Sequence, residues 1–243
     1  MNFIKTAFKK LLLPENRHWF MLLYWLLFGA AFWTMEAMSQ RTYHTVVSSL
    51  DKYIPFCKWF VIPYFFWFIF IVGSMAYFIF KDKTAFVKYM WFVIISHTAT
   101  LVVYAVYPTQ QLLRPQELNG RGVLISIVRW LYGFDTSTNV CPSLHVIGSF
   151  AVCFAAFHCE RLRRPVIRAA FAAATAVICA ATVFLKQHSI VDVFWGTVVS
   201  VVVYPFVFLN NRISGFLVGI FCLPSERKEL LTYTGGCDKI KTI

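Results

Sequence analysis

Charged residues are few in this chain of 243 residues: they make up 14% of it, whereas hydrophobic residues make up 59%. These proportions lie outside the usual range of a soluble globular domain. Long apolar segments alternate with short clusters of basic residues. The composition therefore predicts a single integral membrane domain over residues 1–243.

Signals of several other protein classes are missing. The seven cysteines form no Cys-x-x-Cys pair and mostly fall in apolar stretches, so we expect neither a disulfide framework nor a zinc site. The first apolar run, His18 to Met38, ends without a small-residue cleavage motif and is expected to remain as a transmembrane helix. The net charge of +12 comes from basic residues spread along the chain, which favours anionic lipid over nucleic acid as a partner.

Apolar segments of about 20 residues are long enough to cross a bilayer. The sequence contains six, the fourth of them short, at residues 19–38, 58–80, 86–107, 143–158, 166–185 and 189–209. They predict an all-α bundle of six transmembrane helices. A last apolar stretch, Ile213 to Leu223, is too short to span and is expected at the membrane interface.

The longest connection in the chain lies between the third and fourth of these segments. Four of its apolar residues recur at helical spacing: Val123, Ile127, Trp130 and Leu131. Arg121 and Arg129 lie off this stripe. The pattern predicts a short amphipathic helix on the membrane surface, and a re-entrant or packed loop is the alternative.

The distribution of Lys and Arg predicts the orientation in the membrane. With six spans, both termini lie on one side, and most of the 23 Lys and Arg residues fall on that side. The others are Arg41, Lys52, Lys58, Arg114, Arg121, Arg129 and Lys186. The positive-inside rule therefore predicts a multi-pass protein with cytoplasmic N- and C-termini.

Two polar clusters occur where apolar segments begin. One is Cys141-Pro142-Ser143-Leu144-His145, and the other is Lys186-Gln187-His188-Ser189-Ile190-Val191-Asp192. The separation of His145 from His188 corresponds to two crossings of about 20 residues each and a tight turn. The two imidazoles are therefore expected on the same face, away from the cytoplasm.

These residue types match the needs of phosphoryl transfer, which requires donors around the phosphate oxygens, a nucleophile and an acid for the leaving group. Ser143 is expected to be the N-cap of a helix whose free N–H groups favour an anion. His188 and Asp192 are one helical turn apart, so the carboxylate can orient the imidazole. Arg114, which is followed by Pro115, and Lys186, two residues before His188, are the cations expected near these positions.

Each residue also has a simpler explanation when taken alone, because a single histidine near a helix end is usually interfacial. His97 is expected to take part in helix packing through hydrogen bonding. Glu36 and His158 lie near segment ends and are expected to reach the membrane interface. The convergence of Arg, Ser, Lys, two His and Asp on one face favours a functional site, because ionisable groups near a membrane are costly.

Arg114-Pro115, Pro142-Ser143-Leu144-His145 and His188-x-x-x-Asp192 together resemble the motifs of the type 2 phosphatidic acid phosphatase superfamily, over residues 107–195. The resemblance implies a six-helix membrane protein with a catalytic core at about residues 86–209 and an extracytoplasmic site. It implies that His188 is the nucleophile, that His145 is the acid and that Asp192 is the partner of His188. Arg114 and Ser143 would bind phosphate oxygens, and no metal or other cofactor is implied.

Two cations of that family pattern are replaced in this sequence. Tyr107 stands in place of a Lys in the first motif, and Ala181-Thr182 in place of Ser-Arg in the third. Lys186 can substitute for one of them. Leu144 stands where Gly is common in the second motif. This variant pattern is similar to the branch that contains inositol phosphorylceramide synthases, which transfer a headgroup.

We therefore expect a lipid phosphatase that acts on a phosphorylated lipid. The first alternative is a transferase that passes a phosphoryl or phosphoalcohol group to an alcohol. A metalloenzyme with two His and one Asp as ligands ranks low, because Arg114 and Lys186 would be unfavourable neighbours of a dication. A non-enzymatic lipid transporter also ranks low. The sequence leaves the particular lipid, the oligomeric state and the outer compartment open.

Overall fold

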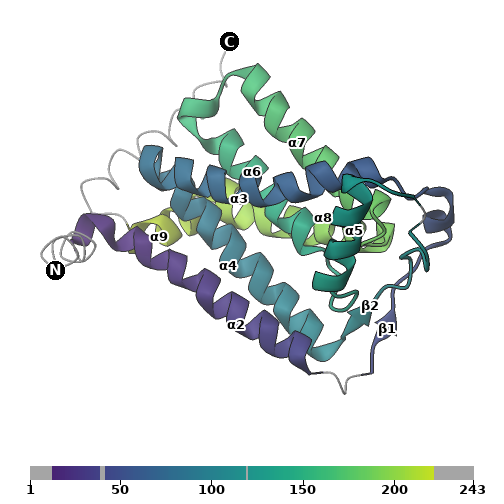
Figure 1. Cartoon of the computed structure of the whole chain (residues 1–243). Helices are drawn as coiled ribbons and strands as arrows, with labels where there is room; N and C mark the ends of the chain where they lie inside the picture. The colour runs from purple at the N-terminus through teal and green to yellow at the C-terminus, as the bar shows by residue number, and fades with distance from the viewer. Residues whose placement is uncertain (1–12, 39–41, 119, 222–243) are drawn as a thin grey trace, which may run out of the picture.

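The computed structural model describes residues 13–38, 42–118 and 120–221, and these are mostly helical (Figure 1). Five helical segments are long and apolar enough to cross a membrane: Asn16–Ala37, Lys58–Lys81, Lys83–Val106, Pro165–Phe184 and Ile190–Leu209. They match five of the six segments expected from the sequence. The chain is therefore a helical protein with five candidate membrane-spanning helices in its described part.

These segments contain the main helices of the fold. They are α2 (Leu23–Ala37), which continues the 3-10 helix Pro14–Leu22, and α3 (Val61–Lys81), α4 (Lys83–Val106), α7 (Pro165–Phe184) and α8 (Ile190–Tyr204). A π-helical turn, Pro205–Leu209, extends α8, and its Asn210 N donates to Pro205 O over 2.8 Å. Pro205 has no N–H to donate, which accounts for the change of helix type at this position.

The fourth predicted segment is α6 (Leu144–His158), with 15 residues. It packs against α3, α4, α7 and α8. Small residues allow this close approach: a Cβ on Gly148 would lie 3.1 Å from the Trp67 side chain, and one on Gly196 of α8 would lie 3.0 Å from Ser143 O. The start of α6 is therefore held tightly between α3 and α8.

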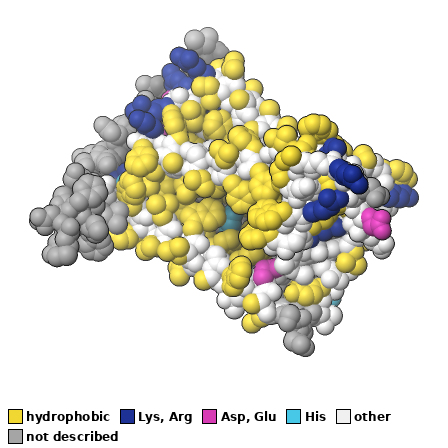
Figure 2. Space-filling view, viewed as in Figure 1, with side chains coloured by type: hydrophobic (Ala, Val, Ile, Leu, Met, Phe, Trp, Pro, Cys, Tyr) yellow, Lys and Arg dark blue, Asp and Glu magenta, His cyan; other side chains and the backbone are white. Residues whose placement is uncertain are grey.

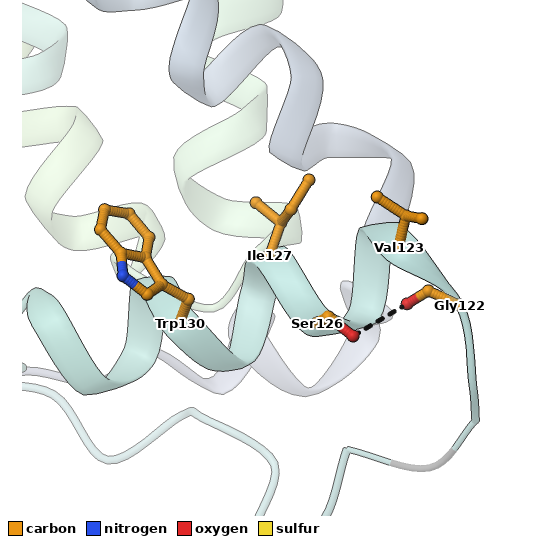
Figure 3. A pocket seen from close by; sticks show the side chains of 5 residues that line it. All are labelled: Gly122, Val123, Ser126, Ile127 and Trp130. Carbon is orange, nitrogen blue, oxygen red and sulfur yellow. Dashed lines mark hydrogen bonds between the residues drawn. The ribbon is translucent and has the colours of Figure 1, made fainter.

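The connection before α6 contains the predicted short helix, α5 (Val123–Phe134). Its buried face consists of Ile125, Val128 and Leu131, of which only Leu131 belongs to the predicted stripe. Val123 and Trp130 are instead 76% and 58% exposed, and they lie with Ile127 along one side of the helix (Figure 3). The helix is apolar on two sides, so periodicity alone did not identify the side that packs on the protein.

Two short strands join the loops at the α5 end of the molecule. β1 (His44–Thr45) pairs in parallel with β2 (Thr109–Gln110), and Thr138 forms an antiparallel bridge to Gln110. The sequence pattern did not predict these strands, because each has only two residues. They bring the loops that follow α2, α4 and α5 together.

The two ends of the bundle differ. The α6–α7 connection and both ends of the described chain lie at one end, opposite α5 and the strands (Figure 1). Figure 2 shows hydrophobic side chains over much of the surface between the two ends, and Lys and Arg side chains in separate areas at each end. The predicted interfacial stretch corresponds mainly to α9 (Asn211–Phe221). Cys222 and Leu223 lie outside the described residues, as do the basic residues Lys5, Lys9, Lys10, Arg41, Arg227, Lys228, Lys239 and Lys241.

Candidate functional site

His145 and His188 lie next to each other at the α5 end of the bundle. Their ring centroids are 5.8 Å apart and the rings are steeply inclined, at 64°. His145 belongs to the first turn of α6, and His188 comes two residues before α8. The close packing of α6 on α8 therefore brings together two histidines that are remote in sequence, as their spacing predicts.

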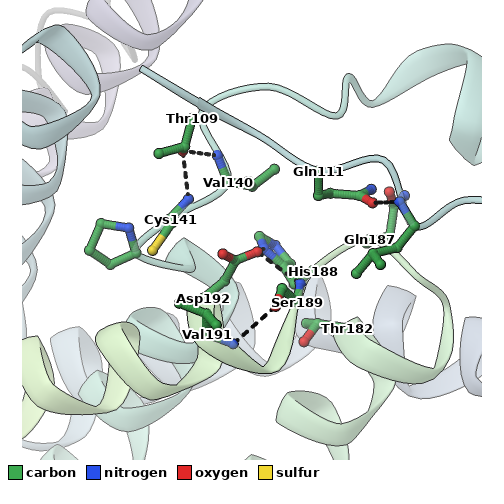
Figure 4. Close-up of polar contacts among 12 residues, drawn as sticks. Thr109, Gln111, Val140, Cys141, Thr182, Gln187, His188, Ser189, Val191 and Asp192 are labelled. Atoms are coloured by element: carbon green, nitrogen blue, oxygen red, sulfur yellow. Dashed lines mark hydrogen bonds and ion pairs between the residues drawn. The ribbon is translucent and has the colours of Figure 1, made fainter. Parts of the chain in front are cut away.

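The expected contact between His188 and Asp192 is present (Figure 4). His188 Nδ1 lies 3.1 Å from Asp192 Oδ2, and the carboxylate is fully buried. The same oxygen accepts a hydrogen bond from Ser189 N at 2.9 Å, as part of the capping box that starts α8. When His188 donates its Nδ1–H to this oxygen, Nε2 of the ring has a lone pair for a ligand or substrate.

The His145 ring is held by two aromatic residues of α3. Its centroid lies 4.5 Å from the Tyr64 ring and 4.3 Å from the Trp67 ring. Trp67 Nε1 also donates to His145 O at 3.1 Å. His145 Nε2 is buried and has no hydrogen-bond partner within the described chain. It is therefore available to a group in the cavity that the two histidines line.

Ser143 is the N-cap residue of α6, as expected from the sequence, but its side chain makes no capping hydrogen bond. The residue is fully buried and Oγ has no partner within the described ranges. Ser143 N donates to Asp192 O at 3.1 Å, which joins the two motifs directly. Tyr104 Oη donates to Pro142 O at 2.6 Å and fixes the preceding turn.

Cys141 lies beside the Asp192 carboxylate. Burial and the negative charge of Asp192 raise the pKa of the Cys141 thiol to about 12, so the thiol stays protonated near neutral pH. Thr109 Oγ1 accepts hydrogen bonds from Val140 N and Cys141 N at 3.1 and 3.0 Å (Figure 4). The loop before α6 is thus fixed by the strand that follows α4.

Arg114 donates to protein groups. Its guanidinium donates to the carbonyl oxygens of Tyr132, Asp135 and Thr136 at 2.9–3.1 Å, and to Gln187 Oε1. The guanidinium also stacks over the Tyr132 ring at 4.7 Å. Arg114 therefore links the end of α5 to the turn before α8, and it is not among the residues that line the cavity beside the histidines.

Lys186 also makes its contact away from the histidines. The residue is buried, and its Nζ donates to Asp51 O at 2.8 Å. Burial lowers the pKa of the Lys186 ammonium, and the charge of Asp51 opposes that shift. The two expected phosphate cations thus lie near the histidines in the fold, but each makes its hydrogen bonds to the protein.

A cavity of about 240 Å³ adjoins both histidines. About half of its lining residues are Phe, Tyr or Trp from α2, α3, α4 and α5, and no Lys or Arg of the described residues lines it. Asp135 supplies its carboxylate, which accepts a hydrogen bond from Tyr64 Oη at 2.9 Å. Burial raises the pKa of Asp135, and the Tyr64 hydrogen bond and the His188 charge oppose the rise.

An apolar groove between α3 and α5 adjoins this cavity. It has a volume of about 570 Å³, and Phe65 and Trp130 line both spaces. Their ring centroids are 6.1 Å apart. A molecule with a polar end and a long apolar chain could therefore place the two parts in adjoining spaces.

Sequence reasoning missed Asp51, which lies in the short 3-10 helix Ser49–Tyr53 that precedes α3. Its carboxylate accepts hydrogen bonds from Ser189 Oγ at 2.6 Å and from Ile190 N at 2.9 Å. The residue is 1% exposed and therefore stabilises the start of α8 from inside the protein. The Ser48-x-x-Asp51 spacing is a capping signal, but it does not predict the contact with Ser189.

Glu36 lies near the end of α2, as expected, and makes contacts that the sequence did not indicate. Its carboxylate accepts hydrogen bonds from Thr136, from Thr138 at 2.9 Å and from Asn139 at 2.5 Å. It therefore ties the end of α2 to the loop at the rim of the cavity. His97 packs against α2 through aromatic contacts, with its ring 5.6 Å from Trp25 and 5.1 Å from Phe28, while its Nδ1 lies 3.4 Å from Ser96 Oγ of its own helix.

Comparisons of the chain with protein-family models, curated proteins and solved structures found no match. Its function is therefore inferred from its own residues and their arrangement.

Proposed function

We propose that this chain is a membrane phosphatase that removes phosphate from a phosphorylated lipid through a phosphohistidine at His188. The observation that carries the proposal is the pairing of a carboxylate-bound imidazole with a second imidazole 5.8 Å away, centroid to centroid, in one largely apolar cavity. An apolar lining strengthens electrostatic interactions with a reacting phosphate, because it lowers the local dielectric constant.

In the proposed reaction, His188 Nε2 attacks phosphorus and the bond between phosphorus and the lipid oxygen breaks. His145 gives a proton to the departing alkoxide, and Asp192 stabilises the positive charge that develops on the His188 ring. Water then attacks the phosphohistidine while His145 accepts its proton. Inorganic phosphate leaves, and His188 returns to its starting state.

Three other residues are proposed to stabilise the negative charge of the bound phosphate. Ser143 has a buried Oγ with no partner in the described chain and lies at the N-terminus of α6, where N–H groups favour an anion. Arg114 and Lys186 are proposed to act through their positive charge, since their hydrogen bonds go to protein oxygens. No cofactor is part of the proposal.

The proposed membrane arrangement has six spans, with α6 as the fourth. The central position of α6 among α3, α4, α7 and α8 supports this count despite its 15 residues. Both termini are proposed to be cytoplasmic, because the basic α6–α7 connection lies at the same end of the bundle as both ends of the described chain. The site is then extracytoplasmic, and α5 lies at the outer surface with its exposed apolar side against lipid.

Headgroup transfer is the second candidate. The cavity lining contains a carboxylate, Asp135, and no Lys or Arg from the described ranges. A doubly charged phosphate monoester requires more compensation of charge than a singly charged phosphodiester. This observation favours a transferase that passes the phosphoryl or phosphoalcohol group from His188 to an alcohol.

Purified protein in lipid nanodiscs tests both candidates. The substrates are phosphatidic acid, diacylglycerol diphosphate, a polyprenyl diphosphate and a phosphodiester lipid, each with and without a lipid alcohol and in the presence of EDTA. We expect inorganic phosphate to be released despite chelation. A new phosphorylated lipid that forms only with the alcohol would establish transfer. Neither product from any substrate, with lipid binding intact, would contradict an enzymatic function.

A further inference from the structure

Three buried polar atoms of cavity-lining residues have no hydrogen-bond partner within the described chain: Asn139 Oδ1, His145 Nε2 and Gln187 Nε2. Gln187 immediately precedes the proposed nucleophile. We propose that Gln187 Nε2 donates a hydrogen bond to a phosphate oxygen, and that Arg114 is the positioning residue that orients this amide. This inference rests on the proposed function and adds a phosphate-binding residue to it.

The orientation of the Gln187 amide follows from its contact with Arg114. A guanidinium only donates hydrogen bonds, so the amide atom that it contacts must be the acceptor Oε1. The NH₂ group therefore lies on the other branch of the amide. Because Gln187 is only 2% exposed, bulk water is a poor partner for this group. A buried donor of this kind is costly unless a ligand satisfies it.

The backbone around Gln187 is held firmly. Gln187 N and His188 N both donate to Thr182 O, at 3.0 and 3.1 Å. Lys186 has a positive φ of 55°, and its carbonyl accepts a hydrogen bond from Gln111 Nε2 at 2.8 Å. A donor fixed in this way needs little reorganisation when charge develops on the phosphate.

Gln187 also has a suitable position relative to the reacting atoms. Its side chain and that of His188 line the same cavity, and they are neighbours in the chain. No described Lys or Arg lines that space, so a neutral amide provides the donor there. Arg114 stands behind the amide and polarises it through the shared hydrogen bond.

Gln187→Glu is the decisive variant. It retains an oxygen for Arg114 but replaces the NH₂ donor by a second oxygen, which repels phosphate. We expect kcat/KM for lipid phosphate to fall by about 10²-fold or more, the usual cost of losing one preorganised donor. The matched control is Gln110→Glu, which makes the same change of charge at a side chain that donates a hydrogen bond to Thr45 Oγ1 of β1 and does not line the cavity. We expect this control to retain wild-type kcat/KM.

Orthovanadate, which mimics the phosphoryl group in its transition state, provides a readout without turnover. We expect it to raise the Tm of the wild type and of Gln110→Glu, but not that of Gln187→Glu. Gln187→Met, which has neither oxygen nor NH₂, replaces Gln187→Glu if the latter does not fold, and the same losses are expected.

Wild-type kcat/KM and vanadate stabilisation in Gln187→Glu would overturn the inference, because Gln187 would then serve only to hold Arg114. A wild-type protein that neither turns over lipid phosphate nor responds to vanadate would overturn the proposed function itself. Free phosphate and lipid phosphate are distinguished by adding inorganic phosphate as a competitor of both vanadate and the lipid.

Discussion

Replacement of His188 by alanine is expected to abolish phosphate release from lipid substrate. His188 is the side chain whose Nδ1 contacts a fully buried carboxylate while the rest of its ring lines the cavity. Without it, the phosphoryl group has no covalent acceptor, and His145 cannot replace it because it is needed for the leaving group. The measurement is kcat for inorganic phosphate in nanodiscs, with thermal unfolding as the check on folding.

The matched control for this variant is His44→Ala. His44 lies at the same end of the molecule, but it is exposed and stacks on Tyr107 at 4.0 Å between ring centroids. We expect this control to keep normal turnover. Substantial turnover by folded His188→Ala would contradict the assignment of the nucleophile.

The second large effect is expected for His145→Ala. We expect kcat to fall by about 10²- to 10⁴-fold, the usual contribution of a general acid. The acid is required because a lipid alkoxide leaves poorly without a proton. The variant also removes a ring packed between Tyr64 and Trp67, so its thermal stability must be measured alongside.

Substrates with different leaving groups show whether His145 is a general acid or has only a structural role. p-Nitrophenyl phosphate releases a phenolate that needs no proton, so His145→Ala should lose far less activity on it than on lipid phosphate. An equal loss on both substrates would show that His145 supports the site without donating the proton.

The sequence predicted the parts of this fold that depend on local pattern. Apolar length identified the helices, and the one-turn spacing of His188 and Asp192 predicted their contact. The sequence also predicted that His145 and His188 lie on the same face, because the number of residues between them fits two crossings and a turn. Each of these properties depends on the geometry of individual helices, which is regular.

Polar contacts between residues that are distant in the sequence could not be predicted from local pattern. Asp51 and Ser189 are 138 residues apart in the sequence, and several helices lie between them. The spacing of apolar residues gives no indication that the two side chains meet. Charge alone also gave an incomplete account of Arg114 and Lys186. Both lie near the site, yet their donors are taken by carbonyl oxygens and by Gln187, which only the folded chain reveals.

The most direct test of the account is the chemical identity of the covalent intermediate. Protein mixed with ³²P-labelled lipid phosphate is quenched within milliseconds in alkaline detergent, because phosphohistidine survives alkali and is lost in acid. The labelled peptide is then identified by mass spectrometry. The account predicts phosphate on His188, and none in His188→Ala. Phosphate on another residue, or rapid turnover without any covalent label, would contradict it.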